Sequence, residues 1–355
     1  VGGVFFGGTI ISSPDERGVE GARALIKKYI DNADIPILVT SDFESGCGGM
    51  FKGLTAFPYE MSLGAANDEQ LAYDYGKATA MEARSVGANW TLSPVSDLNL
   101  NPWNPLVGER AIGDDPDLAV RLLKQVVKGM QENGIAACAK HLAAYGAPEA
   151  GRDYNAVELS EHILREFYLP AYKACIDAGA KLVMPSFNNL GGVPSTANPW
   201  IMKKILREEW GYDGLVMSDY AALHELMNHG VTGSLKESAE VAFRNECDVE
   251  MMSGAYYKHL HELIDEGVFS EDELDRSVMR MLELKAELGL FDDPYHKASE
   301  EKERELFYCE KHREIARRAA EESAVLLKND GVLPLSDKIK KIAVIGPFRD
   351  TGAIN

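Results

Sequence analysis

The chain has 355 residues, of which 45% are hydrophobic, 26% charged and 8% aromatic, and its formal net charge is −19 at pH 7. This composition is that of a globular protein with a sizeable core, and it excludes a disordered or fibrous chain. Because so many negative charges repel phosphate backbones, we expect no nucleic-acid partner. The length suits one large domain with a partner, or two ordinary domains.

Short apolar runs predict β-strands along most of the chain. In chain order they cover residues 1–6, 35–41, 88–94, 135–141, 181–187, 214–220 and 247–252. Amphipathic segments lie between them, among them residues 18–32, 117–134 and 160–179, and the last two end in a glycine that suits a helix C-cap. Apolar strands that alternate with helices are typical of a parallel sheet covered by helices, an α/β fold.

Such a sheet is either open and doubly wound or closed into a (β/α) barrel. No G-x-G-x-x-G spacing follows the first strand, so a dinucleotide-binding fold loses its main support. Polar residues instead gather where successive strands end: Asp42 and Glu44, Ser96 and Asp97, Lys140 and His141, and Asp219. The catalytic face of a TIM-type barrel requires this arrangement, so we expect a (β/α) barrel with an eighth strand lost upstream.

The sequence also predicts a domain organisation. Residues 1–290 are expected to form the barrel, truncated at its N-terminus because the chain opens inside a strand-like run without Met. Residues 291–319 are rich in charge and predict a linker and a helix. From 320 to 355, apolar runs around an Asn-Asp-Gly turn predict the start of a second, incomplete domain.

Several chemistries lack support in the sequence. There is no G-x-S-x-G elbow, no H-E-x-x-H and no EF-hand loop, so we expect neither a serine nucleophile nor a metal site, and no cofactor. No run approaches the ~20 apolar residues of a membrane span, so no membrane partner is expected. The cysteines are scattered and predict buried, reduced thiols: Cys47, Cys138, Cys175, Cys247 and Cys309.

Carboxylates with basic residues around them are the chemistry that remains. This combination suits a hydroxyl-rich substrate, held by charge-assisted hydrogen bonds while a carboxylate attacks an electrophilic carbon. Simpler explanations stay open on this evidence alone. Asp219 could cap the helix that follows it, Arg110 could pair with Glu109 at the surface, and Lys140 with His141 could be a solvated loop pair.

Three segments strongly resemble the β-glucosidase-like members of glycoside hydrolase family three: KHLAAYGAPEAGRDYN (140–155), residues 165–198, and ILREEWGYDGLVMSDY (205–220). Residues 284–295 and 316–335 resemble them too, the latter at the entry to that family's second, α/β-sandwich domain. Residues 41–46 (SDFESG) and 106–116 are more similar to the family's β-N-acetylglucosaminidase branch. The resemblance covers nearly the whole chain in order.

The resemblance implies roles for five residues. Asp219 matches the nucleophile that attacks the anomeric carbon and forms a glycosyl-enzyme. Asp42 matches the carboxylate that holds sugar hydroxyls, and Arg110, Lys140 and His141 match the basic residues that hold the others. A nucleophilic carboxylate must stay ionised, and we expect cations such as Lys140 and Arg110 to lower the pKa of Asp219.

A retaining glycosidase also needs a second carboxyl group about 5–5.5 Å from the nucleophile. In β-glucosidase-like relatives this glutamate comes from the second domain, and in the other branch an Asp/His pair on the loop after the Lys-His strand replaces it. The corresponding loop here has no close D-x-H, and His162 falls within the next predicted helix. We therefore expect the general acid/base outside this chain. Tyr220 stands where many relatives carry Trp, and its ring could stack on a sugar.

These observations predict a retaining exo-β-glycosidase of β-glucosidase type, with a carbohydrate substrate that ends in a β-linked, non-reducing sugar. β-Xylosidase, arabinofuranosidase and β-N-acetylglucosaminidase activities on the same scaffold stay open, and so does a non-catalytic carbohydrate-binding barrel. A homo-oligomer also stays open. A cytoplasmic location is slightly favoured, with a secreted or periplasmic one if a leader has been removed.

Overall fold

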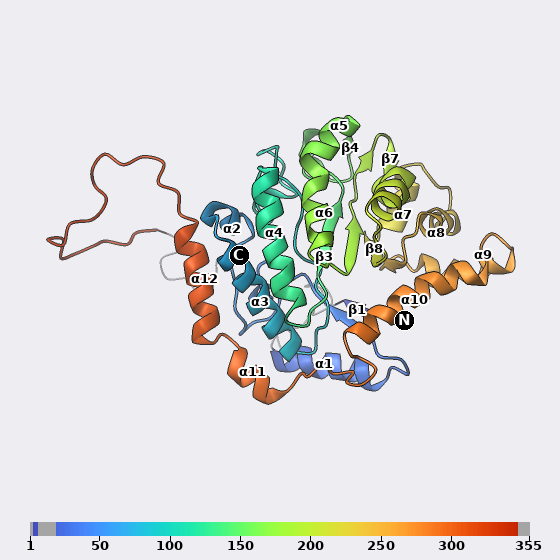
Figure 1. Cartoon of the computed structure of the whole chain (residues 1–355), viewed down its shortest axis with the longest axis horizontal. Helices are drawn as coiled ribbons and strands as arrows, with labels where there is room; N and C mark the ends of the chain where they lie inside the picture. The colour runs from blue at the N-terminus through green and yellow to red at the C-terminus, as the bar shows by residue number, and fades with distance from the viewer. Residues whose placement is uncertain (1–2, 6–18, 347–355) are drawn as a thin grey trace. The chain divides into compact units, whose positions relative to one another are not determined.

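The computed structural model describes residues 3–5 and 19–346 (Figure 1). The ends of the first predicted strand, residues 1, 2 and 6, lie outside the described residues, as do residues 347–355 of the expected second domain. Internal contacts divide the chain into two units, Val1–Ser323 and Ala324–Asn355. Each unit is described separately below.

Parallel strands form the centre of the first unit. They are β1 (Gly3–Phe5), β2 (Leu38–Thr40), β3 (Cys138–Leu142), β5 (Leu182–Pro185), β8 (Leu215–Tyr220) and β9 (Val249–Met251). β1 pairs with β2, and β3, β5, β8 and β9 pair in that order. Residues 89–95 join the two groups, because Trp90 N donates to Val39 O at 3.3 Å and Thr91 N donates to Ala136 O at 2.9 Å.

The inner face of this sheet closes on itself. Side chains from β1 and β9, the first and last strands in the order, share one apolar cluster with side chains from all the strands between them: Phe5, Leu38, Trp90, Leu92, Ala136, Cys138, Leu182, Met184, Leu215, Met217 and Met251. Successive residues of a strand point to opposite faces, and the alternate residues Val39, Ala139 and Val183 pack outward in other clusters. The predicted (β/α) TIM-type barrel is therefore confirmed.

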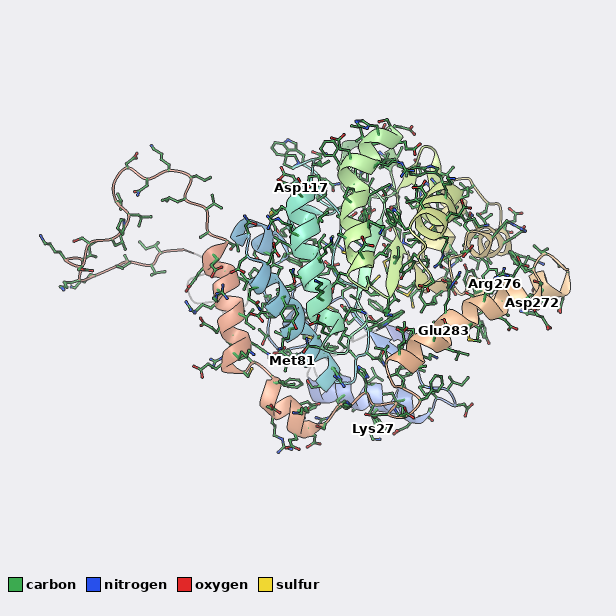
Figure 2. The ribbon with its side chains drawn as sticks, in the orientation of Figure 1. Lys27, Met81, Asp117, Asp272, Arg276 and Glu283 are labelled. Atoms are coloured by element: carbon green, nitrogen blue, oxygen red, sulfur yellow. The ribbon has the colours of Figure 1, made fainter. Side chains whose placement is uncertain are left out.

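Helices cover the outside of the barrel (Figure 1). They are α1 (Val19–Asp31), α2 (Met61–Ala66), α3 (Glu69–Ser85), α4 (Pro116–Gln131), α5 (Glu161–Ile163), α6 (Leu169–Asp177), α7 (Ala222–Asn228), α8 (Leu235–Arg244), α9 (Ala255–Asp265), α10 (Glu271–Glu287), α11 (Glu300–Leu306) and α12 (Glu310–Glu322), with π-helical segments at Leu164–Tyr168 and Trp200–Glu209. Gly134 and Gly179 follow α4 and α6 with φ of +84° and +100°, as expected of glycines that end helices. Charged side chains such as Lys27, Asp117 and Asp272 lie on the outer surface (Figure 2).

Smaller elements complete the first unit. One small sheet contains β4 (Ala156–Val157), β6 (Asn189–Leu190) and β7 (Val193–Pro194), and short 3-10 turns lie at Cys47–Gly49, Gly108–Arg110, Glu149–Gly151 and Ser195–Ala197. The cysteines are free thiols, and all are buried except the half-buried Cys309. In the part of the chain that the structure describes, no helix is both long and apolar enough to span a bilayer.

α3 and α4 pack closely because two glycines face each other's backbone. A Cβ atom added to Gly76 would lie 2.3 Å from Val126 O, and one added to Gly129 would lie 2.2 Å from Tyr73 O. α12 packs against α2 and α3, and a buried hydrogen bond of 2.9 Å joins His312 Nδ1 to Glu82 Oε1. The helices that surround the N-terminal strands therefore form a continuous shell.

The second unit has neither helix nor strand in its described residues, 324–346. Its apolar side chains are exposed, including Leu327 and Ile345 at 92% and 89%. Asn329 Oδ1 accepts hydrogen bonds from Gly331 N and Val332 N at 3.1 and 3.0 Å, which forms the turn expected at Asn-Asp-Gly. That this segment begins an α/β-sandwich domain remains a prediction.

Candidate active site

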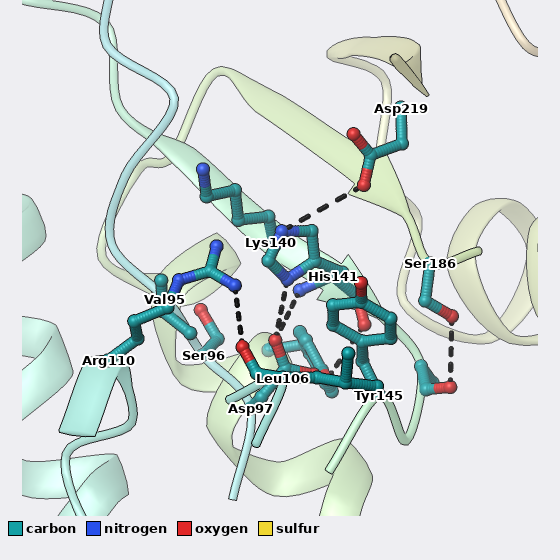
Figure 3. A network of polar contacts seen from close by, with 12 residues as sticks. Val95, Ser96, Asp97, Leu106, Arg110, Lys140, His141, Tyr145, Ser186 and Asp219 are labelled. Atoms are coloured by element: carbon teal, nitrogen blue, oxygen red, sulfur yellow. Dashed lines mark hydrogen bonds and ion pairs between the residues drawn. The ribbon is translucent and has the colours of Figure 1, made fainter. Parts of the chain in front are cut away.

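A cluster of charged side chains lies at the carboxyl ends of the barrel strands (Figure 3). Asp42 follows β2, Lys140 and His141 belong to β3, and Asp219 is the penultimate residue of β8. Arg110 closes a 3-10 turn in the loop before α4. The structure thus brings together all five site residues that the sequence predicts, although they are spread over 178 positions of the chain, from 42 to 219.

A bulge explains why Lys140 and His141 both reach the site. Neighbouring residues of a regular strand point to opposite faces. The pairing of β3 with β5 shifts register between Lys140 and Leu142, which leaves His141 as the extra residue. Bulges re-aim side chains in this way and are common beside active sites. Both side chains are buried, with 3% and 4% of their surface exposed.

Lys140 and Arg110 are held by two carboxylates. Lys140 Nζ lies 2.8 Å from Asp42 Oδ1 and 2.7 Å from Glu44 Oε1. Arg110 donates to both oxygens of Glu44, through Nε at 2.7 Å and Nη2 at 2.8 Å. Burial would raise the pKa of Glu44, but the charges of Lys140 and Arg110 outweigh it and hold that pKa well below its usual range. Both cations are therefore fixed in place by carboxylates.

Asp97 holds His141 by hydrogen bonds to its ring and its backbone. Asp97 Oδ2 accepts from the His141 backbone N at 2.9 Å and lies 2.7 Å from Nδ1. The Tyr172 hydroxyl donates to Asp97 Oδ1 and lies 2.8 Å from His141 O. On its other side the imidazole presents Nε2 to Asp219 Oδ2 at 3.9 Å. The ring of Tyr145 flanks His141, with the two ring centroids 4.8 Å apart.

Asp219 is buried, and its electrostatic environment differs from the expected one. Burial raises the pKa of Asp219, while the charge of His141, a hydrogen bond from Tyr220 N at 2.7 Å and the charge of Lys140 lower it, and the net shift is upward. The expectation that neighbouring cations would lower this pKa overall is wrong because desolvation is the larger effect. Arg110, the other cation invoked, binds Glu44 instead.

The simpler explanations for these residues do not fit the geometry. α7 begins after Ala221 with no side-chain cap, so Asp219 does not cap it. Arg110 pairs with Glu44, and Glu109 is exposed to solvent. Lys140 and His141 are buried rather than solvated. Within the described ranges, no group of three or more His, Cys, Asp or Glu side chains is arranged to hold a metal ion.

Sequence reasoning assigned no role to three residues that the structure places in this site, Glu44, Asp97 and Tyr172. Glu44 and Asp97 were noted as polar residues at strand ends, but nothing assigned either one a partner. The signal that could have found them is their position: each is a carboxylate that closely follows a predicted strand, where a barrel gathers its functional groups. Tyr172 carried no such signal because it lies within an amphipathic helix pattern.

An aromatic wall extends from His141 toward the surface. Beyond Tyr145 comes Phe187, at 6.1 Å between ring centroids, and Tyr154 packs on Phe187 at 4.8 Å. Asp153 Oδ1 accepts from the Tyr145 hydroxyl at 2.8 Å and from Tyr154 N at 2.9 Å, which ties the wall together. Tyr220 is 44% exposed immediately beyond Asp219. Flat apolar faces beside a polar cluster suit the hydrophobic faces of sugar rings.

Comparison with known proteins identifies the family. The family model described as Glycosyl hydrolase family 3 N terminal domain matches residues 1–284. The chain belongs to glycosyl hydrolase family 3. Among family 3 relatives, the periplasmic β-glucosidase of Salmonella typhimurium is 36% identical over 308 residues, which cover 84% of this chain and 40% of that protein. A putative β-xylosidase of Formosa agariphila is 31% identical, over 91% of this chain and 44% of that protein.

Solved structures of family 3 proteins share the fold. The β-glucosidase of Listeria innocua, crystallised in complex with isofagomine, superposes with a TM-score of 0.83 at 38% identity, covering 90% of this chain and 45% of that one. A β-glucosidase of Erythrobacter marinus gives a TM-score of 0.85 at 31% identity, covering 94% and 45%. This chain therefore spans less than half the length of the relatives named here.

Proposed function

We propose that this chain supplies the nucleophile and most of the sugar-binding groups of a retaining exo-β-glycosidase of β-glucosidase type. The observation that carries the proposal is a buried carboxylate, Asp219, whose Oδ2 lies 3.9 Å from His141 Nε2 at the carboxyl end of the barrel. The β-glucosidase names of several family 3 relatives support this substrate class.

The proposed reaction uses the cluster in two steps. An oxygen of Asp219 attacks the anomeric carbon, the glycosidic C–O bond breaks, and the leaving oxygen takes a proton from a general acid. Water then attacks the glycosyl-enzyme while the same group, now a general base, takes one of its protons, and the C–O bond to Asp219 breaks to release the sugar and the carboxylate. Asp42, Arg110, Lys140 and His141 hold the sugar hydroxyls, and hydrogen bonds to them strengthen as positive charge develops on the ring.

The raised pKa of Asp219 serves this role only if the group still ionises at working pH. His141 and Lys140 oppose the effect of burial, so the carboxylate is partly desolvated and yet electrostatically supported. A desolvated carboxylate is a better nucleophile than one surrounded by water, because less solvent must be displaced during attack. The balance between burial and cations is therefore part of the proposed mechanism.

We infer that the general acid/base comes from outside these 355 residues. The other carboxylates of the cluster are already engaged: Asp42 and Glu44 with Lys140, and Asp97 with His141. Glu60, within electrostatic reach of Lys140 and Arg110, accepts a hydrogen bond from Val95 N at 3.1 Å. The charges of Lys140 and Arg110 outweigh burial and hold the pKa of Glu44 well below its usual range, so Glu44 is not a proton donor near neutral pH. The enzyme's second carboxyl group must then approach from another part of the protein.

Substitution of Asp219 in the complete protein tests the proposal. We expect turnover of at least one aryl β-glycoside in a panel of glucoside, xyloside, arabinofuranoside and N-acetylglucosaminide, and loss of several orders of magnitude in Asp219→Asn. A 2-fluoro sugar should form a covalent adduct on Asp219, detected by peptide mass spectrometry. Asp213→Asn, at an exposed position six residues earlier, is the matched control and should retain activity.

The outcomes separate the alternatives. Near-full activity in Asp219→Asn would show that the proposed nucleophile is wrong. Sugar binding without turnover by the complete protein would favour a carbohydrate-binding barrel. Faster hydrolysis of the xyloside, arabinofuranoside or N-acetylglucosaminide than of the glucoside would keep the mechanism and change the substrate.

A further inference from the structure

We propose that Asp97 is a positioning residue that keeps a proton on Nδ1 of His141 and fixes the rotation of the ring, so that Nε2 faces the bound sugar and Asp219. The inference rests on the proposed function, because it concerns how one sugar-binding side chain of that site is aimed. It adds a buried second layer, Asp97 with Tyr172, to the groups that contact substrate.

Asp97 contacts both the ring and the backbone of His141. A carboxylate oxygen accepts hydrogen bonds, so an Asp97 Oδ2–Nδ1 separation of 2.7 Å requires the proton on Nδ1. The same oxygen accepts from the backbone N of His141 at 2.9 Å. Asp97 thus binds both the backbone and the ring of one residue, which fixes the ring's rotation as well as its tautomer.

The Asp97 carboxylate is completely buried. The Asp97 side chain has 0% of its surface exposed, and its carboxylate contacts only His141 and Tyr172 in the hydrogen bonds that the structure gives it. Burying a carboxylate costs several kcal/mol unless its partners compensate, and an apolar residue would fill the space without that cost. Because the hydrogen bonds of the Asp97 carboxylate go to His141 and to the Tyr172 hydroxyl, the arrangement points to orientation of His141.

Tyr172 holds the Asp97 carboxylate in place. Its hydroxyl on α6 donates to Asp97 Oδ1, and it lies 2.8 Å from His141 O. The carboxylate therefore has one oxygen for the histidine and one for the tyrosine. This leaves Nε2 as the one ring nitrogen turned toward Asp219, 3.9 Å from its Oδ2.

Other ionisable groups also face the pair and bear on any pH measurement. Asp219 on β8 faces Nε2, and Tyr145 on the loop after β3 packs against the ring. Arg110 in the loop before α4 and Tyr168 in the π-helical segment are both within electrostatic reach of Asp97. The role of Asp97 is therefore better measured by the protonation of the two His141 ring nitrogens, and by kcat/KM for substrates that lack one hydroxyl, than by the pH dependence of activity.

The tautomer itself is measurable without a variant. In the complete protein labelled with ¹⁵N-histidine, we expect the neutral His141 ring to show a protonated Nδ1 and a bare Nε2, assigned by comparison with His141→Gln. The opposite tautomer in wild-type protein would overturn the proposal. Because this readout needs no turnover, it stays decisive even if the proposed glycosidase activity fails.

A substrate series tests the consequence for binding. For a set of monodeoxy aryl glycosides of the preferred sugar, removal of the hydroxyl held by His141 should lower kcat/KM in wild-type enzyme and have little effect in His141→Gln. Asp97→Asn should reduce kcat/KM of the parent glycoside by about 10-fold or more and reduce the penalty for that same hydroxyl. The penalties for the hydroxyls held by Lys140 and Arg110 should remain.

Asp248→Asn is the matched control, since Asp248 is equally buried but lies at the amino end of β9. It should leave the His141 tautomer and every hydroxyl penalty unchanged. Tyr172→Phe should give a smaller loss than Asp97→Asn at the same hydroxyl. Equal loss of all hydroxyl penalties in Asp97→Asn, or kcat/KM within twofold of wild type, would show that Asp97 has only a structural role.

Discussion

Glu44 is the residue on which the charge balance of the site depends most. It accepts hydrogen bonds from Arg110 with both oxygens and pairs with Lys140, so one carboxylate separates two cations that would otherwise repel each other. A bidentate contact also fixes the plane of the Arg110 guanidinium. The positions of Lys140 and Arg110, the two cations proposed to bind the sugar, thus depend on Glu44.

Glu44→Gln should weaken both substrate binding and folding. The change leaves Lys140 with Asp42 alone and removes the charge from the Arg110 contact, so we expect KM to rise about 10-fold or more. Removal of one partner from a buried ion pair costs about 3 kcal/mol or more, measurable as a lower free energy of unfolding in urea. The matched control is Glu109→Gln beside Arg110, which should change that free energy by less than about 0.5 kcal/mol. Equal effects of the two variants would mean that Arg110 pairs with Glu109 in solution.

The sequence predicts which residues meet in the candidate site, but it does not predict which of them form ion pairs and hydrogen bonds with one another. Carboxyl ends of parallel strands meet at one end of a barrel, so Asp42, Lys140 and Asp219 were expected to converge. The choice of Glu44 over Glu109 as the partner of Arg110 depends on how a loop folds back across 66 positions. No spacing rule describes such a contact. The net rise in the pKa of Asp219 was missed for a related reason, because burial is a property of the assembled fold.

At the level of elements, the apolar runs predicted where strands lie better than where they end. Residues 135–141 were expected as a strand, and β3 covers Cys138–Leu142. Residues 88–94 lie between β2 and β3 as expected, but they form only isolated bridges, at Trp90 and, just past the predicted run, at Val95. Pro94 has no N–H to donate, which limits regular pairing there. Strand ends depend on partners, which periodicity does not contain.

The close approach of α3 and α4 leads to a prediction about helix packing. Gly76→Ala adds a methyl group whose carbon would lie 2.3 Å from Val126 O, and the obstacle is backbone that cannot rotate away. Alanine gains about 1 kcal/mol in helix propensity, but forcing the two helices apart disturbs the packing along both. We expect the clash to dominate, with a net loss of about 1–3 kcal/mol in the free energy of unfolding.

Chemical denaturation of Gly76→Ala alongside Lys128→Ala measures this balance. Lys128 is exposed on α4 one position before Gly129, so its substitution tests helix propensity without crowding. It should leave stability within about 0.5 kcal/mol of wild type. A Gly76→Ala protein more stable than wild type would show that the helices separate at little cost.

At the level of the barrel as a whole, buried charged groups lie at both ends of the strands. The carboxyl end holds the candidate active site. At the amino end, Asp248 accepts from Arg207 Nη2 at 2.9 Å, from Arg280 Nη1 at 2.7 Å and from Val216 N at 2.9 Å. These contacts join β8, the start of β9, the Trp200–Glu209 segment and α10. In TIM-type barrels, polar groups at the amino end serve stability and those at the carboxyl end serve catalysis.

Asp248→Asn should therefore lower stability and spare activity. The substitution removes the buried charge that Arg207, whose side chain is only 8% exposed, shares with Arg280, and it leaves Glu246 as the carboxylate between them. We therefore expect a loss of about 3 kcal/mol in the free energy of unfolding. Well below the melting temperature, kcat/KM should stay within twofold of wild type because Asp219 and its neighbours lie at the other end of the strands. Asp177→Asn, which breaks an exposed pair with Lys173 on α6, is the control and should cost no more than about 1 kcal/mol. Loss of activity in Asp248→Asn at unchanged stability would show that the two ends of the barrel are coupled, and that the amino-end cluster takes part in catalysis from a distance.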